Sequence, residues 1–187
     1  STVADTPASI TAISSTEIED KGITDMHDLK HMVPSMNFTN VLGAQNITIR
    51  GIGQFNGNPG VSVSTDGVFQ SRAHSSQLGE MDLERVEVLR GPQGTLYGRN
   101  SIGGVVNLIT KNPSQDRDGY IKLGYGNYNT TKAETAFGGG ISDSTSFRLV
   151  LSTTDQGEGY YDCLNAGCGE QGYTDKQAYR LKINSDI

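Results

Sequence analysis

The sequence predicts an α+β domain followed by a run of antiparallel β-strands, and three observations support this fold class. The chain of 187 residues has 24 glycines and only 34% hydrophobic residues, which suits strands and turns better than a helical bundle. Seven of the eight tyrosines lie after residue 118, whereas four of the five prolines lie before residue 112. Helical patterns occur only in the first region. We therefore expect a domain over residues 1–113, a polar connector over 114–118 and strands over 119–187.

The first region begins with two short predicted helices. Ser14 stands three residues before Glu17, which is a capping-box pattern, and Gly22 is suited to end the helix. A second helix is predicted from Thr24 and is stopped by Pro34. Three apolar residues within it recur at helical spacing: Met26, Leu29 and Val33. These helices are expected to flank a small sheet.

Strands are predicted over residues 47–50 and 61–65. The second of these leads into Asp66 and Gly67, a dipeptide suited to the positive φ angles of a tight hairpin turn. Asp66 and Gly67 are therefore predicted turn residues.

The segment 83–111 is the most informative part of the chain. Its first part alternates, with Val86 and Val88 on one side and Arg85 and Glu87 on the other, which is the period of a half-buried strand. A glycine-punctuated turn follows, with three predicted turn residues: Gly91, Pro92 and Gly98. Leu96 and Tyr97 are predicted to supply an apolar anchor within it. A further strand is expected over residues 105–110.

Four segments of the second region alternate cleanly, namely residues 120–125, 132–137, 146–151 and 179–183. One side is apolar or aromatic: Ile121, Leu123, Tyr125, Phe147, Leu149, Leu151, Tyr179, Leu181 and Ile183. The other side carries Lys122, Gly124, Arg148, Arg180 and Lys182. Two interpretations remain open on this pattern: a soluble sheet with one packed face, or barrel strands with an apolar face toward lipid. No apolar run approaches the ~20 residues of a membrane helix.

The two cysteines, Cys163 and Cys168, lie in a polar, glycine-rich stretch between predicted strands. We expect them to form a disulfide in an oxidising compartment, with free thiols as the alternative. A zinc site is disfavoured because it needs four ligands and no other Cys or His lies nearby. The net charge of −6 without a basic cluster argues against nucleic-acid binding.

No pattern of catalytic residues is present. Residues 51–60 begin like a dinucleotide-binding loop, but Asn56 takes the place of its third glycine, and residues 91–99 lack the ending of a phosphate loop. Ser101 fails the spacing of a hydrolase nucleophile. His27 and His31 lie four residues apart but lack a third metal ligand. We therefore predict no enzymatic activity, no cofactor and no bound metal ion.

Four segments of the first region closely resemble the plug domain of TonB-dependent outer-membrane receptors. They are residues 5–36, 47–53, 61–69 and 83–98, and they occur in the order of that family. The resemblance implies a plug domain inside a barrel of ~22 strands. Residues 119–187 would then be the first strands of an incomplete transmembrane barrel, and the chain a fragment of a longer protein. A TonB box is expected upstream of Ser1.

The resemblance also implies a function. Such receptors import a scarce nutrient, for example a siderophore–iron complex or a vitamin, across the bacterial outer membrane. The expected partners are the energy-transducing protein TonB at the periplasmic side, an extracellular polar ligand, and outer-membrane lipid. The alternative is an exported β-rich binding or adhesion module without transport.

Two groups of site residues follow from the resemblance. The expected ligand-binding residues lie in two turns at the floor of the cavity: Gln54, Phe55, Asn56, Asn58, Gln70, Arg72, His74 and Gln77. The expected contacts between plug and barrel are made by five charged residues: Arg50, Glu84, Arg85, Glu87 and Arg90. Arg50 and Arg90 would reach barrel carboxylates or the ligand. Glu84, Arg85 and Glu87 would form a local charge ladder at the boundary.

Overall fold

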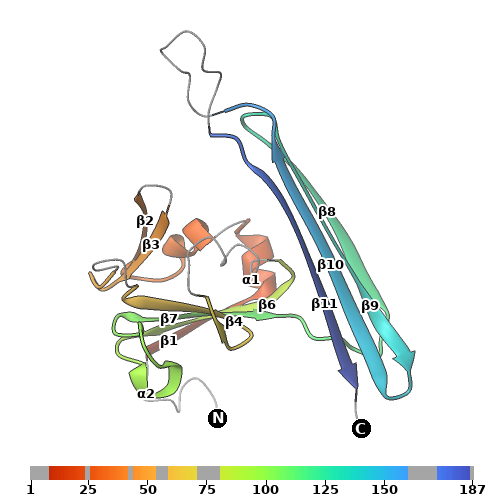
Figure 1. Cartoon of the computed structure of the whole chain (residues 1–187), viewed down its shortest axis with the longest axis horizontal. Helices are drawn as coiled ribbons and strands as arrows, with labels where there is room; N and C mark the ends of the chain where they lie inside the picture. Colours follow the sequence, from red (N-terminus) through yellow and green to blue (C-terminus); the bar gives the residue numbers. More distant parts are fainter. Residues whose placement is uncertain are drawn as a thin grey trace. The chain divides into compact units, whose positions relative to one another are not determined.

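The structure is a computed structural model that describes residues 9–23, 26–41, 44–53, 59–70, 81–159 and 172–185. It contains two compact units, Ser1–Lys111 and Asn112–Ile187 (Figure 1). In the described ranges, no helix has the length and hydropathy needed to cross a membrane.

The N-terminal unit starts with strand β1 (Ser9–Ser14), which leads directly into helix α1 (Ser15–Asp20). The predicted capping box is confirmed. The Ser14 N–H donates to Glu17 Oε2 at 2.9 Å, and the Glu17 N–H donates to Ser14 Oγ at 3.3 Å. The bond from the Ser14 N–H, followed by one from the Ser14 hydroxyl to Glu17 Oε2 at 3.0 Å, lowers the pKa of Glu17. Gly22 has a φ of 61° and ends the helix, because the left-handed region costs glycine little.

The second predicted helix is a short 3₁₀ helix, η2 (Met26–His31). Its apolar stripe is confirmed as core, since Met26, Leu29 and Val33 are each at most 2% exposed. The N–H groups of Met32 and Val33 both donate to the Leu29 carbonyl, so the chain tightens before Pro34.

A five-stranded sheet, in the order β1-β6-β7-β4-β5, forms the centre of this unit. Its other strands are β4 (Val61–Thr65), β5 (Val68–Phe69), β6 (Leu83–Arg90) and β7 (Gly104–Thr110). Strands β4 and β7 pair in parallel, and the other neighbours are antiparallel. The strands predicted at 61–65, 83–90 and 105–110 are therefore confirmed.

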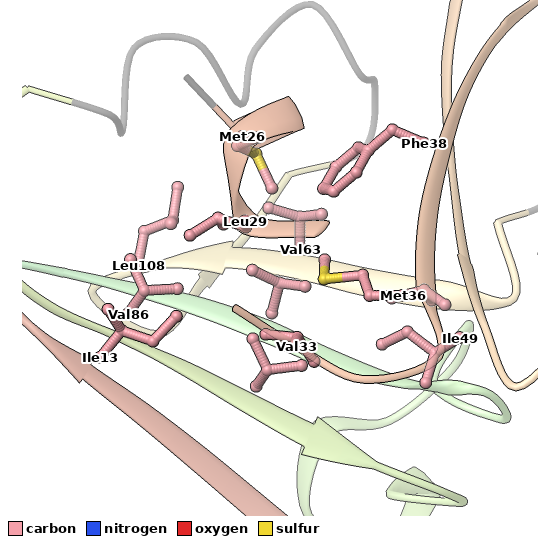
Figure 2. Close-up of a cluster of buried hydrophobic side chains, with 13 residues drawn as sticks. Ile13, Met26, Leu29, Val33, Met36, Phe38, Ile49, Val63, Val86 and Leu108 are labelled. Carbon is pink, nitrogen blue, oxygen red and sulfur yellow. The ribbon is translucent and has the colours of Figure 1, made fainter. Parts of the chain in front are cut away.

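The core lies on one face of this sheet. Figure 2 shows Val63, Val86 and Leu108 pointing toward side chains of η2 and of a separate hairpin. That hairpin consists of β2 (Met36–Val41) and β3 (Ala44–Ile49), and it contributes Met36, Phe38 and Ile49 to the core. Removing this apolar surface from water is the main favourable term that holds the unit together.

The predicted anchor at Leu96 is wrong. Residues Gly94–Tyr97 form a short helix, α2, that leaves Leu96 80% exposed. The turn is held instead by Ser101, which is 1% exposed and donates from Oγ to the Gly98 carbonyl at 2.6 Å. Tyr97, the other predicted anchor residue, is half-buried.

The second unit is a four-stranded antiparallel sheet in the order β11-β10-β9-β8. Its strands are β8 (Asp118–Gly126), β9 (Thr130–Ser142), β10 (Thr145–Gln156) and β11 (Asp175–Ser185). The four alternating segments of the sequence are confirmed as strands, each longer than its alternating segment. Cys163 and Cys168 lie outside the described residues, so the disulfide remains a prediction.

Candidate functional site

The predicted hairpin turn does more than reverse the chain. Asp66 and Gly67 have φ angles of 49° and 81°, as expected for a tight turn between β4 and β5. The two carboxylate oxygens of Asp66 accept from the Thr110 N–H at 2.9 Å and from its hydroxyl at 2.6 Å. The turn therefore holds the end of β7, where the chain leaves the N-terminal unit.

The expected charge ladder forms on β6. Arg85 donates from Nη1 to Glu84 Oε1 at 2.6 Å and from Nε to Glu87 Oε1 at 2.7 Å. The bond to Glu87 raises the pKa of Arg85. The row continues across the sheet, because Asn107 donates to Glu87 and accepts from Ser64. The local ladder is thus present, while its contact with a barrel remains a prediction.

The two predicted arginine sites lie at strand ends. Arg50 is exposed with a φ of 53°, and its N–H donates to the Ser35 carbonyl at 3.0 Å. Arg90 ends β6 opposite Ser9 and Gly104, and its Nε is buried without a hydrogen-bond partner among the described residues. The roles proposed for these arginines stay predictions.

Most of the expected ligand-binding residues lie outside the described residues: Gln54, Phe55, Asn56, Asn58, Arg72, His74 and Gln77. Gln70 is described. Its N–H donates to the Val63 carbonyl at 2.8 Å, so it extends the β4–β5 hairpin. Gln70 is the first residue of the second predicted turn. That turn therefore starts at the β4–β5 hairpin, in which β4 pairs with β7.

The turn residues Gly91, Pro92 and Gly98 surround α2. The Gly91 N–H donates to the Gly103 carbonyl at 3.0 Å, and the Gly103 N–H donates to the Gly60 carbonyl at 2.8 Å. A Cβ at residue 60 would lie 2.3 Å from the Gly53 carbonyl oxygen. Glycine is required there because two backbone segments touch. Sequence reasoning missed this contact between the loop after β3 and the start of β4.

The sheet of the second unit has two chemically different faces. Registers of the strand pairs place all six basic residues of the strands on one face: Lys122, Lys132, Arg148, Lys176, Arg180 and Lys182. We call this the basic face. Two acidic residues, Asp118 and Glu134, share it. Lys122 Nζ lies 4.7 Å from the ring centroid of Tyr120, which is a cation–π distance.

The opposite face, here called the apolar face, exposes large hydrophobic side chains. They include Ile121, Leu123, Tyr125, Phe137, Leu151, Tyr179, Leu181 and Ile183. Their exposed fractions range from 45% for Leu151 to 83% for Tyr179. A contiguous apolar surface of this kind marks an interface with lipid or with another protein. Only at one end does it carry paired acids, Asp155 and Asp175.

A protein-family description of the TonB-dependent receptor plug domain matches residues 2–105 of this chain. The chain belongs to that family. Family members are transport receptors, and the match confirms the resemblance drawn from the four sequence segments. The plug domain, as we now call the N-terminal unit, is followed by antiparallel strands, so the predicted fold class is also confirmed.

Three relatives extend the likeness beyond the plug domain. The pesticin receptor of Yersinia enterocolitica is 32% identical over 86% of this chain, which corresponds to 24% of that protein. An iron-regulated outer membrane virulence protein of Vibrio cholerae is 30% identical over 97% of this chain and 30% of its own length. The crystal structure of the ferric yersiniabactin uptake receptor from Yersinia pestis has a TM-score of 0.80, with 29% identity, over 94% of this chain and 28% of that one.

The chain therefore spans only 24–30% of the length of these relatives. Its localisation is the bacterial outer membrane, as the resemblance implied.

Proposed function

We propose that this chain is the plug domain and first wall strands of a receptor that imports a ferric siderophore across the outer membrane with energy from TonB. The observation that carries the proposal is the two-faced sheet that directly follows the plug domain. A strand array with one exposed apolar face and one charged face has the chemistry of a barrel wall between lipid and an aqueous lumen.

The lengths of the links between strands support an orientation for this wall. Strands β9 and β10 are joined by two residues, Asp143 and Ser144, whereas β10 and β11 are joined by residues 157–174. Outer-membrane barrels have short periplasmic turns and longer extracellular loops. The end with Asp143 is therefore the periplasmic end, and the apolar face meets lipid along the length between.

The charges of the basic face support an anionic cargo. Six basic side chains stand against two acidic ones on this face of the four strands. A lumen lined mostly by one sign of charge raises the local concentration of ligands of the opposite sign. Bare metal ions would be repelled, so iron would enter inside an anionic chelate. The names of the relatives point to the same cargo class, since one of them is a ferric yersiniabactin uptake receptor.

We expect uptake of iron to depend on both the receptor and TonB. The siderophore is supplied as culture supernatant of the same bacterium, freed of iron and then loaded with a radioactive iron isotope. A strain that lacks the full-length receptor should fail to accumulate this isotope. Complementation should restore uptake only when TonB is present. Binding without any TonB-dependent accumulation would instead support the alternative, an exported binding or adhesion module.

The ligand site proposed from sequence can be tested separately. Alanine substitutions at Phe55, Arg72, His74 and Gln77 in the full-length receptor should weaken binding of the siderophore that has been loaded with labelled iron. These side chains offer a stacking face, donors and acceptors rather than one fixed charge. Lys30→Ala, in the exposed part of η2, is a matched control. Wild-type affinity in all four variants, at equal amounts of folded receptor, would exclude this cavity floor.

A further inference from the structure

The segment between the two units is fixed against the sheet that follows it. Residues 112–117 precede β8, and the carbonyl oxygen of Gln115 accepts from the Gly140 N–H of β9 at 3.1 Å. Gln115 Nε2 also donates to the Asp143 carbonyl at 3.5 Å. Asn112 Oδ1 accepts from Lys182 Nζ of β11 at 3.3 Å. One short segment thus bonds to β9, to the β9–β10 turn and to β11.

Glycines of β9 leave the room that this segment occupies. A Cβ at residue 139 would lie 2.9 Å from Arg117 Cγ and 3.3 Å from Arg117 Cα. A Cβ at residue 140 would lie 2.1 Å from Gln115 Oε1. Distances below 3.0 Å force one group to move. The Gln115 amide can turn aside, at the loss of its bond to Asp143, whereas the Arg117 backbone lies 3.3 Å away, so alanine at both positions would loosen the connector on the strand. Gly139 and Gly140 together form what we call the glycine seat.

An ion pair fastens the end of the connector. Arg148 Nη1 donates to both carboxylate oxygens of Asp118, at 2.9 and 2.8 Å. Asp118 and Arg148 stand on β8 and β10, and both are paired in register with Gly138 of the strand between them. Glycine at 138 presents no side chain between the two charges. The Arg148 side chain is 3% exposed, whereas that of Asp118 is 50% exposed, so water screens the pair from the carboxylate side only.

The plug side of the connection is held equally closely. The Lys111 N–H donates to the Asp82 carbonyl at 3.0 Å, directly after Thr110, which is bonded to Asp66. The last residue held by the plug domain is therefore adjacent in sequence to Asn112, the first residue held by the strands.

We propose that residues 112–118 are a seated anchor, held along the barrel wall by β9, β10 and β11, rather than a flexible linker. The glycine seat and the Asp118–Arg148 pair hold this anchor at the periplasmic end of the wall. The inference rests on the proposed function for the identity of the wall. Its consequence for transport is that movement of the plug domain leaves residues 112–118 in place on the wall, so the rearrangement that opens a path lies in the chain before Asn112.

The test uses the full-length receptor in outer-membrane vesicles opened to the periplasmic side, and needs neither ligand nor TonB. The test variant is Gly139→Ala with Gly140→Ala. Its matched control is Gly124→Ala with Gly126→Ala, because added Cβ atoms there would have their nearest neighbours at 3.7 and 4.0 Å, which is ordinary contact. Two readouts follow the anchor: tryptic cleavage after Arg117, measured by mass spectrometry, and hydrogen exchange of the amide of residue 140.

We expect the seat variant to be cleaved after Arg117 about tenfold faster than wild type, since cleavage follows the population of the detached segment. Exchange at residue 140 should accelerate with it, because its N–H bonds to the connector. The control pair should behave as wild type. Equal rates in the seat variant and the control would overturn the proposal, as would rapid cleavage of the wild type.

If the seat variant fails to assemble, the variant Asp118→Asn tests the anchor with the same two readouts. It removes the charge that pairs with Arg148, and Asp116→Asn is its control because Asp116 accepts from Ser114 through its backbone carbonyl. Faster cleavage in Asp118→Asn alone supports the anchor, and identical cleavage in both rejects it. A receptor that transports nothing leaves this result unaffected, which separates the anchor from the proposed function.

Discussion

Leu181→Arg should sharply lower the amount of receptor assembled in the outer membrane, whereas Ala178→Arg should leave it nearly unchanged. Leu181 is 58% exposed on the apolar face, in register with Leu149. Ala178 lies on the basic face of the same strand, in register with Ser152. An arginine on the lipid side of a barrel costs about 2–4 kcal/mol near the middle of the bilayer, while the lumen side tolerates charge.

The comparison is direct because both variants add the same side chain to β11. Assembly can be measured from the heat-dependent mobility of the folded barrel on gels, and stability from urea unfolding in vesicles. Equal loss in both variants would mean that the apolar face does not meet lipid. It would favour a packed soluble sheet, the interpretation that alternation alone left open.

Local patterns in the sequence predicted local structure well. The capping box needs only Ser14 and Glu17, and the hairpin turn needs only Asp66 and Gly67, so both can be recognised without knowledge of the fold. Alternation predicted the strands for a similar reason, since the period of two is a property of the strand itself. The family resemblance supplied what these patterns lack, namely that the first segments together form a plug domain and that the later strands belong to a barrel.

Contacts between distant residues could not be predicted from the sequence. Asp66 and Thr110 are 44 positions apart, and their bonds depend on β4 and β7 lying in parallel. The pair of Asp118 and Arg148 likewise requires the register of three strands. Each of these side chains could equally have been solvated at the surface, which is the common state of charged residues.

The wrong prediction that Leu96 is an apolar anchor has a related cause. A leucine within a glycine-rich turn suggests burial, but the direction of a side chain depends on whether the turn is extended or helical. Residues 94–97 form one helical turn, and Ser101 closes it with a hydrogen bond that the sequence gives no reason to expect.

The second large effect is expected at Gly104, the first residue of the central strand β7. Gly104→Ala should destabilise the plug domain by about 3 kcal/mol, at the upper end of what overpacking usually costs. A Cβ at this position would lie 2.4 Å from the Leu89 carbonyl oxygen and 3.1 Å from Ile49 Cδ1. The first clash is with the backbone of β6, which cannot turn aside as a side chain can.

Gly94→Ala is the matched control, because a Cβ at residue 94 would meet no atom within 4 Å. This residue begins α2, where alanine should stabilise by about 0.5 kcal/mol or slightly more. Hydrogen exchange over Gly104–Thr110 in the full-length receptor measures both effects, since these amides pair with β4 and β6. Exchange should accelerate in Gly104→Ala and slow or stay constant in Gly94→Ala. Unchanged exchange in Gly104→Ala would show that β6 and β7 separate easily at this point, and that the plug sheet is held chiefly by its helices and the β2–β3 hairpin.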